Sequence, residues 1–180
     1  MYSRGGRRRG GGSGEAAECG ITESLGVAKD VGHIHVGYKI GLIMTTKVYE
    51  VLPEAAIEIR EKVFVEEQGF AEEFDSMDKT AFHMVVYDGG RAAATCRYYE
   101  AAAGEYVLGR IAVLREYRGR RIGAEMIAAA EDEVRRAGGK TMLIHAQTRV
   151  RVFYEKQGYA AFGDIDFEEN REHIWMKKAL

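Results

Sequence analysis

A strand, a basic turn containing glycine, and a helix follow one another without a break near the middle of this chain. Residues 108–114 form an apolar run of strand length, and apolar residues recur at helical spacing through 122–137. Between them, residues 118–124 read Arg-Gly-Arg-Arg-Ile-Gly-Ala. The unpaired N–H groups and the dipole at a helix N-terminus attract anions, and guanidinium groups suit phosphate oxygens. This order predicts an α/β fold whose basic turn binds a phosphate-bearing cofactor.

Two familiar phosphate-binding motifs do not describe this turn. A Walker loop would continue into Gly-Lys-Ser or Gly-Lys-Thr, and a dinucleotide fingerprint would read Gly-x-Gly-x-x-Gly. Neither pattern is present. A solvated turn without a ligand is the alternative, because short motifs also occur by chance.

Composition narrows the possible partners and the compartment. The chain has 180 residues and a formal net charge of -2, so its bulk charge predicts neither a nucleic-acid nor a membrane partner. No apolar run approaches the roughly 20 residues of a membrane span. The two cysteines, Cys19 and Cys96, match no disulfide framework and no zinc spacing. We therefore expect a cytoplasmic protein.

The N-terminal part differs from the rest. Residues 1–14 are almost entirely Gly, Arg and Ser, and residues 15–43 show no clear periodicity. We expect residues 1–43 to be a disordered or non-native extension and residues 44–180 to form the folded domain. A role for the basic tail in RNA binding is the alternative, and it predicts steeply salt-dependent binding.

The patterned part alternates strands and helices. The turn Asp88-Gly89-Gly90 predicts a hairpin, and Gly69, Gly138-Gly139 and Gly158 end three helices. The expected strands are 46–51, 81–87, 91–99, 106–114, 141–146, 162–167 and 173–177, and the expected helices are 52–67, 122–137 and 150–157. The expected buried face of the middle helix is Ile122, Met126, Ile127, Ala130 and Val134. This order predicts an α/β sandwich with a mixed central sheet of about six to seven strands flanked by helices.

At this point the chain resembles the GNAT N-acetyltransferases, over residues 46–180. Their turn after the fourth strand reads Arg/Gln-x-x-Gly-x-Gly/Ala and holds the pyrophosphate of coenzyme A. Arg118 and Gly123 match its first and last positions, while Arg121 stands where the middle glycine is expected. An arginine there would be strained if that position required a positive φ. A second match is Phe153-Tyr154 followed by Gly158-Tyr159, which resembles the aromatic-tyrosine pair and Gly-aromatic turn of the family.

Within the superfamily the chain is similar to the ElaA/YjcF-like branch. The residues that carry this resemblance are Arg60-x-x-Val63-Phe64-Val65-x-Glu67-Gln68-Gly69, Glu73-x-Asp75-x-x-Asp78, Ala81-x-His83, Ala94-Thr95-x-Arg97, Gly109-Arg110-Ile111-Ala112-Val113, His145-Ala146-Gln147 and His173. The resemblance implies the GNAT-like acyl-CoA N-acyltransferase fold for residues 44–180.

The resemblance also assigns roles to individual residues. Tyr154 is expected to be the general acid, because a phenol can protonate a departing thiolate at little cost. Its alternative is a core tyrosine. Cofactor binding is assigned to Ile111, Ala112, Val113, Arg118, Gly119, Arg120, Arg121, Ile122, Gly123 and Ala124.

The base that deprotonates the acceptor is left open. The candidates are Glu66, Glu67, His83 and His145, with Glu67 and His83 preferred, and a water relay is a further possibility. Each histidine could equally be a satisfied structural group.

Three other groups of residues each have a structural and a chemical interpretation: the acidic stretch, Cys96 and the carboxylates near residue 166. The acidic stretch 72–78 either attracts a cationic amine or forms a solvated loop. Cys96 is expected to be a small buried hydrophobe rather than an acyl carrier. The carboxylates at 164, 166, 168 and 169 match no metal motif, so we expect no metal.

The resemblance implies transfer of an acetyl group from acetyl-CoA to a primary amine of a small molecule or peptide. Attack would be direct, in a ternary complex. The alternatives are an acyl-homoserine-lactone synthase-like acyltransferase and a non-catalytic CoA-binding module. Such synthases generally lack the basic turn, because they take acyl groups from a carrier protein. We expect a monomer, or a homodimer formed by edge pairing of an exposed final strand.

Overall fold

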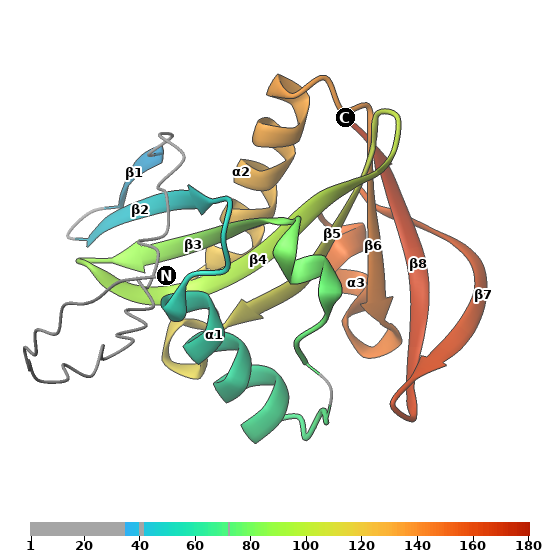
Figure 1. Ribbon diagram of the computed structural model, residues 1–180, viewed down its shortest axis with the longest axis horizontal. Helices are drawn as coiled ribbons and strands as arrows, with labels where there is room; N and C mark the ends of the chain where they lie inside the picture. The colour runs from blue at the N-terminus through green and yellow to red at the C-terminus, as the bar shows by residue number, and fades with distance from the viewer. Residues whose placement is uncertain (1–34, 40–41, 72) are drawn as a thin grey trace, which may run out of the picture.

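A single mixed sheet organises the molecule. The computed structural model describes residues 35–39, 42–71 and 73–180, and Figure 1 shows helices on both sides of the sheet. Among the described residues it has eight strands in the order β1-β2-β3-β4-β5-β6-β8-β7. The strands are β1 His35–Lys39, β2 Leu42–Tyr49, β3 Phe82–Asp88, β4 Arg91–Ala102, β5 Glu105–Val113, β6 Thr141–Gln147, β7 Ala160–Glu168 and β8 Arg171–Ala179. Of these eight described strands, only β5 and β6 pair in parallel. The expected α/β class with a mixed sheet is confirmed.

The sequence pattern did not predict two features of the sheet. Strand β1 lies before Met44, in the segment without clear periodicity. The last strand, β8, is not an edge strand, because it is enclosed between β6 and β7. The expectation of an exposed final strand was therefore wrong, and β7 forms that edge of the sheet.

The helices cover opposite faces of the sheet. Helix α1 is Glu54–Arg60, α2 is Ile122–Arg136 and α3 is Arg151–Glu155. Short 3-10 turns cover Ser76–Lys79, Arg115–Tyr117 and Thr148–Val150. Met84 of β3 packs in the cluster under α2, whereas its neighbour Val85 packs in the cluster under α1. Adjacent residues of a strand point to opposite faces, so the two helices flank the sheet.

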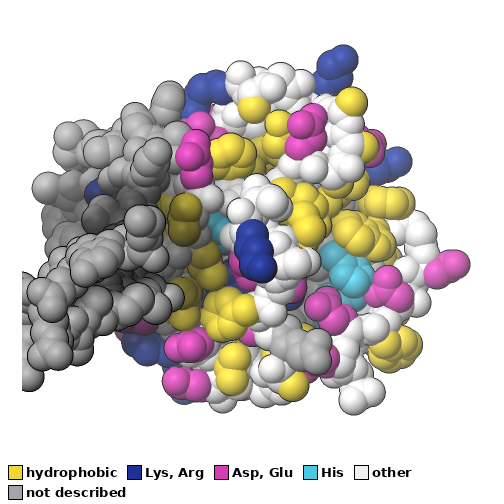
Figure 2. All heavy atoms as spheres, viewed as in Figure 1, with side chains coloured by type: hydrophobic (Ala, Val, Ile, Leu, Met, Phe, Trp, Pro, Cys, Tyr) yellow, Lys and Arg dark blue, Asp and Glu magenta, His cyan; other side chains and the backbone are white. Residues whose placement is uncertain are grey.

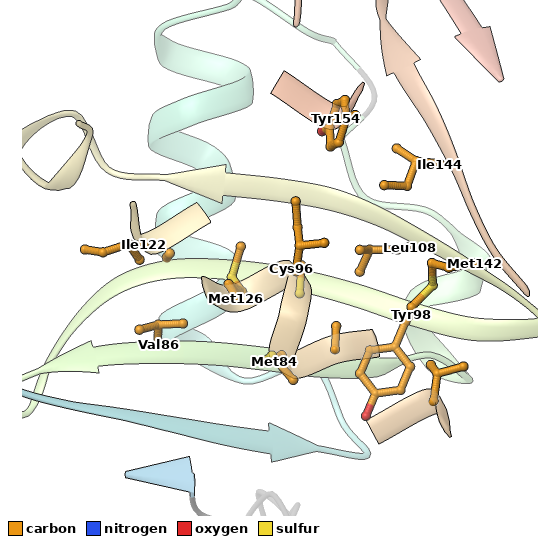
Figure 3. Close-up of a cluster of buried hydrophobic side chains, with 14 of the residues drawn as sticks. Met84, Val86, Cys96, Tyr98, Leu108, Ile122, Met126, Met142, Ile144 and Tyr154 are labelled. Carbon is orange, nitrogen blue, oxygen red and sulfur yellow. The ribbon is translucent and has the colours of Figure 1, made fainter. Parts of the chain in front are cut away.

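The predicted apolar face of α2 is confirmed, since all five of its residues are buried. Figure 3 shows Ile122 and Met126 of this helix beside Met84 and Val86 of β3, with Cys96 of β4 close by. Truncating a fully buried methionine or leucine of such a core to alanine typically costs about 2–5 kcal/mol. This packing holds the N-terminus of α2 at the carboxyl end of β5.

Helix 52–67 was expected to be uniform, but it changes type after Arg60. Residues Glu61–Glu66 form a π-helix, in which the Glu67 N–H donates to the Lys62 carbonyl oxygen at 3.1 Å, five residues earlier. Gly69 then reverses the chain with φ 71°. The wider turn changes the direction in which Phe64 and Gln68 project, and both line the cavity described below.

The sheet opens where β5 and β6 diverge. These strands pair only at Glu105–Val107 with Thr141–Leu143. On the other side of β5, the β4 register shifts so that two residues, Arg110 and Ile111, lie opposite the single residue Cys96. Arg110 adopts φ 51°, as bulged residues can. The bulge and the divergence leave an opening at the carboxyl ends of β5 and β6.

Within the part of the chain that the structure describes, no helix combines the length and the apolar character that a membrane span requires.

Candidate active site

A cavity of about 730 Å³ fills the opening between β5 and β6. Its walls come from the π-helix and the segment that follows it, β5, the basic turn, β6, α3 and the β7–β8 pair. One end carries the basic turn, and the other carries histidine and carboxylate side chains. Figure 2 shows histidine side chains beside acidic and apolar ones on the β6–β8 side of the molecule. The cavity is therefore polar at both ends, with opposite chemical character.

The basic turn leads into the N-terminus of α2, which no side chain caps. Arg121 is the N-cap residue and adopts a left-handed conformation, φ 65° and ψ 6°. Gly119 also has a positive φ, of 76°. With no capping side chain, the first N–H groups of α2 are available to an anion. The strain anticipated for Arg121 is present.

Most residues assigned to the cofactor line this cavity: Ile111, Val113, Arg118, Gly119, Arg121, Ile122, Gly123 and Ala124. Two do not. Ala112 is buried on the α1 side of the sheet, as the alternation of β5 requires. Arg120 lines a second, smaller pocket, and its guanidinium lies 5.3 Å from the ring centre of Tyr117.

Arg118 is held in place by two contacts. Its Nε donates to the Val113 carbonyl oxygen at 2.9 Å, and its guanidinium pairs with Glu67 at 2.9 Å. Glu67 is therefore tied to the basic turn, and it is not among the residues that line the cavity. Glu66 is exposed.

Tyr154 faces the middle of the cavity from α3. Its ring contacts Phe153 and Tyr159 edge-on, at 5.1 and 6.3 Å between ring centres. Figure 3 shows it near Ile144, at the margin of the core. Burial raises the pKa of the phenol. The hydroxyl, which makes no hydrogen bond to a described residue, therefore stays protonated near neutral pH and can donate to a group inside the cavity.

His83 lies outside the cavity, in the core beneath it. It is 1% exposed, and its Nε2 donates to the Asp78 carbonyl oxygen at 3.0 Å. Burial lowers the pKa of the ring. His83 is therefore a neutral group that ties the 3-10 turn to β3.

The described carboxylates of the acidic stretch, at 73, 75 and 78, are bound to arginines, so they act neither as free loop charges nor as an open attractor for amines. Arg60 pairs with Glu73 and Asp78, each at 2.7 Å, and Arg97 pairs with Asp78 at 2.7 Å and with Asp75 at 2.6 Å. Hydrogen bonds from Arg60 and Arg97 hold the pKa of Asp78 well below its usual range, against the opposing effect of burial. Both expectations for this stretch are corrected: its described carboxylates at 73, 75 and 78 neutralise buried arginines.

The ion network extends to the cavity through Arg110. Its Nε lies 3.3 Å from the Glu73 carboxylate, and both residues line the cavity. Burial raises the pKa of Glu73, although Arg110 and Arg60 counteract it. The network thus holds the bulged Arg110 at the wall of the opening.

Two adjacent histidines, His145 and His173, form the far end of the cavity. His145 Nε2 lies 2.7 Å from Asp166, and its ring stacks on Trp175 at 4.7 Å. His173 lies 4.9 Å from His145 between ring centres and lines the same wall as Glu168. Among the four bases considered from the sequence, only His145 lines the cavity.

Sequence reasoning did not assign a role to Arg110, Glu168 or His173, and it considered Glu73 only as part of the acidic stretch; all four line the cavity. One signal was present. In the antiparallel pairing of β6 with β8, Gln147 lies opposite His173 and His145 opposite Trp175. The odd-numbered residues of both strands therefore share one face of the sheet, which is the face of the cavity.

Cys96 is 1% exposed in the core, and burial raises the pKa of its thiol. This agrees with the expected buried hydrophobe. Among the described residues, no group of three or more His, Cys, Asp or Glu side chains is arranged to hold a metal ion.

Comparison with known proteins identifies similar sequences. A family model described as an acetyltransferase (GNAT) domain matches residues 49–180. The uncharacterised N-acetyltransferase YjcF of Bacillus subtilis is 32% identical over 126 residues, which make up 68% of this chain and 89% of YjcF.

Solved structures share the fold. A Lactobacillus plantarum protein described as an N-acetyltransferase matches with a TM-score of 0.72 and 28% identity, over 76% of this chain and 98% of its own. The CoA-dependent acyl-homoserine lactone synthase BjaI, solved with SAM and isopentyl-CoA, matches with a TM-score of 0.63 over 70% of this chain and 74% of its own. At 16% identity the second likeness is one of fold alone.

Proposed function

Because this chain belongs to the GNAT acetyltransferase family, in the branch that includes YjcF and ElaA, we propose that it transfers an acetyl group from acetyl-CoA to a primary amine of a small molecule or peptide. It is an acyltransferase with the GNAT fold. The acetyl donor, the amine acceptor and the direct attack are the parts that we propose.

One observation carries the proposal: a single cavity joins the uncapped N-terminus of α2 to the hydroxyl of Tyr154. A pyrophosphate at the turn gains the helix N–H groups and the guanidinium of Arg118. The free edge of β5 at 111–113 offers backbone groups to the pantetheine arm. This path brings the thioester toward Tyr154.

The chemistry follows from these positions. The amine nitrogen attacks the thioester carbonyl carbon, the C–N bond forms, and the C–S bond breaks with its electron pair left on sulfur. Tyr154 donates its proton to that sulfur. Thiols and phenols ordinarily differ by about 1.5 pKa units, or roughly 2 kcal/mol, which is a small part of a typical barrier. Burial destabilises the thiolate as well as the phenolate, so the donation remains accessible.

The cofactor site is tested by titrating the full chain with acetyl-CoA in a calorimeter. We expect micromolar binding, weakened at least tenfold, or about 1.4 kcal/mol, in the double variant R118A/R121A. The matched control is R135A/R136A, which removes two arginines from the last turn of the same helix. Well-folded protein that does not bind acetyl-CoA would refute the proposal.

Catalysis is tested with acetyl-CoA and four amines: spermidine, tyramine, ethanolamine and a peptide with a free N-terminus. Release of the CoA thiol reports turnover. Tyr154→Phe should leave the dissociation constant of acetyl-CoA unchanged and reduce kcat about 10²- to 10⁴-fold. Binding without turnover of any amine would instead identify a CoA-binding module without acetyltransferase activity toward these amines.

A synthase-like activity is the second candidate, because the fold matches that of BjaI. That protein is described as CoA-dependent, so a coenzyme A site does not by itself separate the two activities. Titration with S-adenosylmethionine does so. Binding of S-adenosylmethionine would favour the synthase, and its absence together with amine turnover would favour the acetyltransferase.

A further inference from the structure

His173 occupies an unusual position for a buried histidine. It projects from β8 into the far end of the cavity, yet only 4% of it is exposed. Its ring faces His145 of β6 and the carboxylate of Glu168 on β7. A side chain held this firmly has one orientation relative to a molecule that enters the cavity.

The hydrogen bonding of His173 determines which ring nitrogen carries the proton. Nδ1 lies 2.9 Å from the Arg171 carbonyl oxygen, and a carbonyl can only accept. Nδ1 of the neutral ring therefore bears the hydrogen, and Nε2 keeps its lone pair. No described residue donates a hydrogen bond to Nε2. The Glu168 carboxylate lies 3.8 Å from Nε2, which is beyond hydrogen-bond distance.

His145 has a different environment, although its ring is adjacent. Its Nε2 is hydrogen-bonded to Asp166 at 2.7 Å, and its Nδ1 lies 3.6 Å from Glu168. A neutral His145 donates from Nε2 to Asp166, so its Nδ1 also keeps a lone pair, beyond hydrogen-bond distance of Glu168. The side chain of His173 is 4% exposed and that of His145 is 24% exposed, so His173 is the histidine whose lone pair is held in one fixed direction.

We propose that Nε2 of His173 is the base that removes a proton from the acceptor ammonium, with Glu168 as the positioning residue that stabilises the resulting imidazolium. This inference rests on the function proposed above and identifies the proton acceptor for it. It replaces the bases considered from the sequence, because Glu67 is paired with Arg118 and His83 lies outside the cavity.

The protons balance as follows. The ammonium R–NH₃⁺ gives one proton to His173 Nε2, and the freed lone pair forms the C–N bond. As the C–S bond breaks, Tyr154 gives its proton to the sulfur, and the second proton lost by the nitrogen reprotonates Tyr154. The products are the N-acetyl amine, the CoA thiol and one proton released to water.

The charges around His173 favour this role. Asp166 and Glu168 face it from β7, and His145 faces it from β6. From β5, Arg110 approaches Glu168 at 3.9 Å but is closer to Glu73 and Asp75, each at 3.3 Å. On β8 itself, Arg171 is directed to the Gln68 carbonyl oxygen and the Phe70 ring. Carboxylates thus predominate near the ring, which attracts an ammonium and stabilises an imidazolium.

The test compares His173→Asn with the unchanged full-length enzyme, using acetyl-CoA and whichever of the four amines above is turned over fastest. Asparagine retains a side-chain N–H close to the position of Nδ1, so it can still donate to the Arg171 carbonyl. We expect kcat to fall about 10²- to 10⁴-fold and the acidic limb of the kcat–pH profile to disappear. Glu168→Gln should lower kcat less and shift that limb.

Glu172→Gln is the control, because Glu172 neighbours His173 but does not line the cavity, and kcat should not change. Calorimetry should give the same acetyl-CoA affinity for all variants. In ¹⁵N-histidine NMR spectra, His173 should show the Nδ1–H form when neutral.

Two results would overturn the role of His173 and leave the proposed function standing. These are full turnover with an intact acidic limb in His173→Asn, or an Nε2–H form of neutral His173. Failure of the unchanged enzyme to acetylate any amine would overturn the proposed function and this inference together.

Discussion

Two substitutions of Arg121 measure the strain at the start of α2. Arg121→Ala and Arg121→Gly both remove the guanidinium, and only the second removes Cβ. At φ 65° and ψ 6°, Cβ crowds the following carbonyl oxygen, which costs about 1–2 kcal/mol. Glycine also increases the conformational entropy of the unfolded chain, which lowers the stability of the folded protein by about 0.4–1 kcal/mol. We therefore expect the glycine variant to be more stable than the alanine variant by about 0.5–1 kcal/mol.

The assay is urea unfolding followed by circular dichroism, extrapolated linearly to water. The same pair of substitutions at Arg120 is the control, because that residue does not have a positive φ. There the order should reverse, with glycine less stable than alanine by about 0.5–1 kcal/mol. A glycine at position 121 that is no more stable than alanine would refute the argument from strain.

Three further predictions concern the buried groups. Arg60→Met removes the arginine that bridges the buried Glu73 and Asp78 and leaves each of them with one arginine partner fewer, so the free energy of unfolding should fall by about 3–5 kcal/mol. Arg135→Met on the surface should change it by less than about 0.5 kcal/mol, with both values taken from urea titration. Similar losses in the two variants would contradict the network. The pKa of His83 is lowered by burial, so the unfolded chain gains its proton first as the pH drops below about 6.5. The free energy of unfolding should therefore decline from pH 7.5 to pH 5.5, which urea unfolding at the two pH values measures. The decline should be smaller in His83→Gln, which keeps a hydrogen-bond donor for the Asp78 carbonyl. Cys96→Ala should retain acetyl transfer, measured by release of the CoA thiol, because burial raises the pKa of the Cys96 thiol and no acyl-enzyme is expected. Loss of turnover in a well-folded Cys96→Ala variant would instead support a covalent acyl-enzyme.

The local elements could be predicted because their signals are local. The apolar face of α2 follows from the spacing of its residues, and all five proved buried. The hairpin at Asp88 follows from Gly89 and Gly90, both of which adopt a positive φ. The π-helix at Glu61–Glu66 has no comparable signal, since its residues suit an α-helix equally well. Contacts with the rest of the fold decide between the two.

Charged residues were harder to interpret than apolar ones. Arg60 and Arg97 look like surface residues in the sequence, yet both are buried. Their burial depends on the simultaneous presence of Glu73, Asp75 and Asp78, which come from a separate segment. No pattern within a single element reveals such a network, because burying a charge is tolerable only when distant partners meet it.

The two ends of the cavity also differ in how far the sequence predicts them. The basic turn is contiguous, so the sequence displays it whole. The opposite end is assembled from separate strands, and the position of each residue depends on register. The shift opposite Cys96 turns Arg110 into the bulge, and the β7–β8 irregularity between Phe162 and Asp166 sets where Glu168 meets His173. A change of one residue in either register would redirect these side chains.

The chain contains one tryptophan, and the fold stacks its ring on His145 at the wall of the cavity. All indole emission from this protein therefore originates directly behind the histidine pair. A protonated imidazole in contact with indole quenches its fluorescence, and a ligand that displaces water changes the emission wavelength. Trp175 thus acts as an intrinsic fluorescent probe of the cavity, which reports protonation of His145 and binding of a ligand without any added dye.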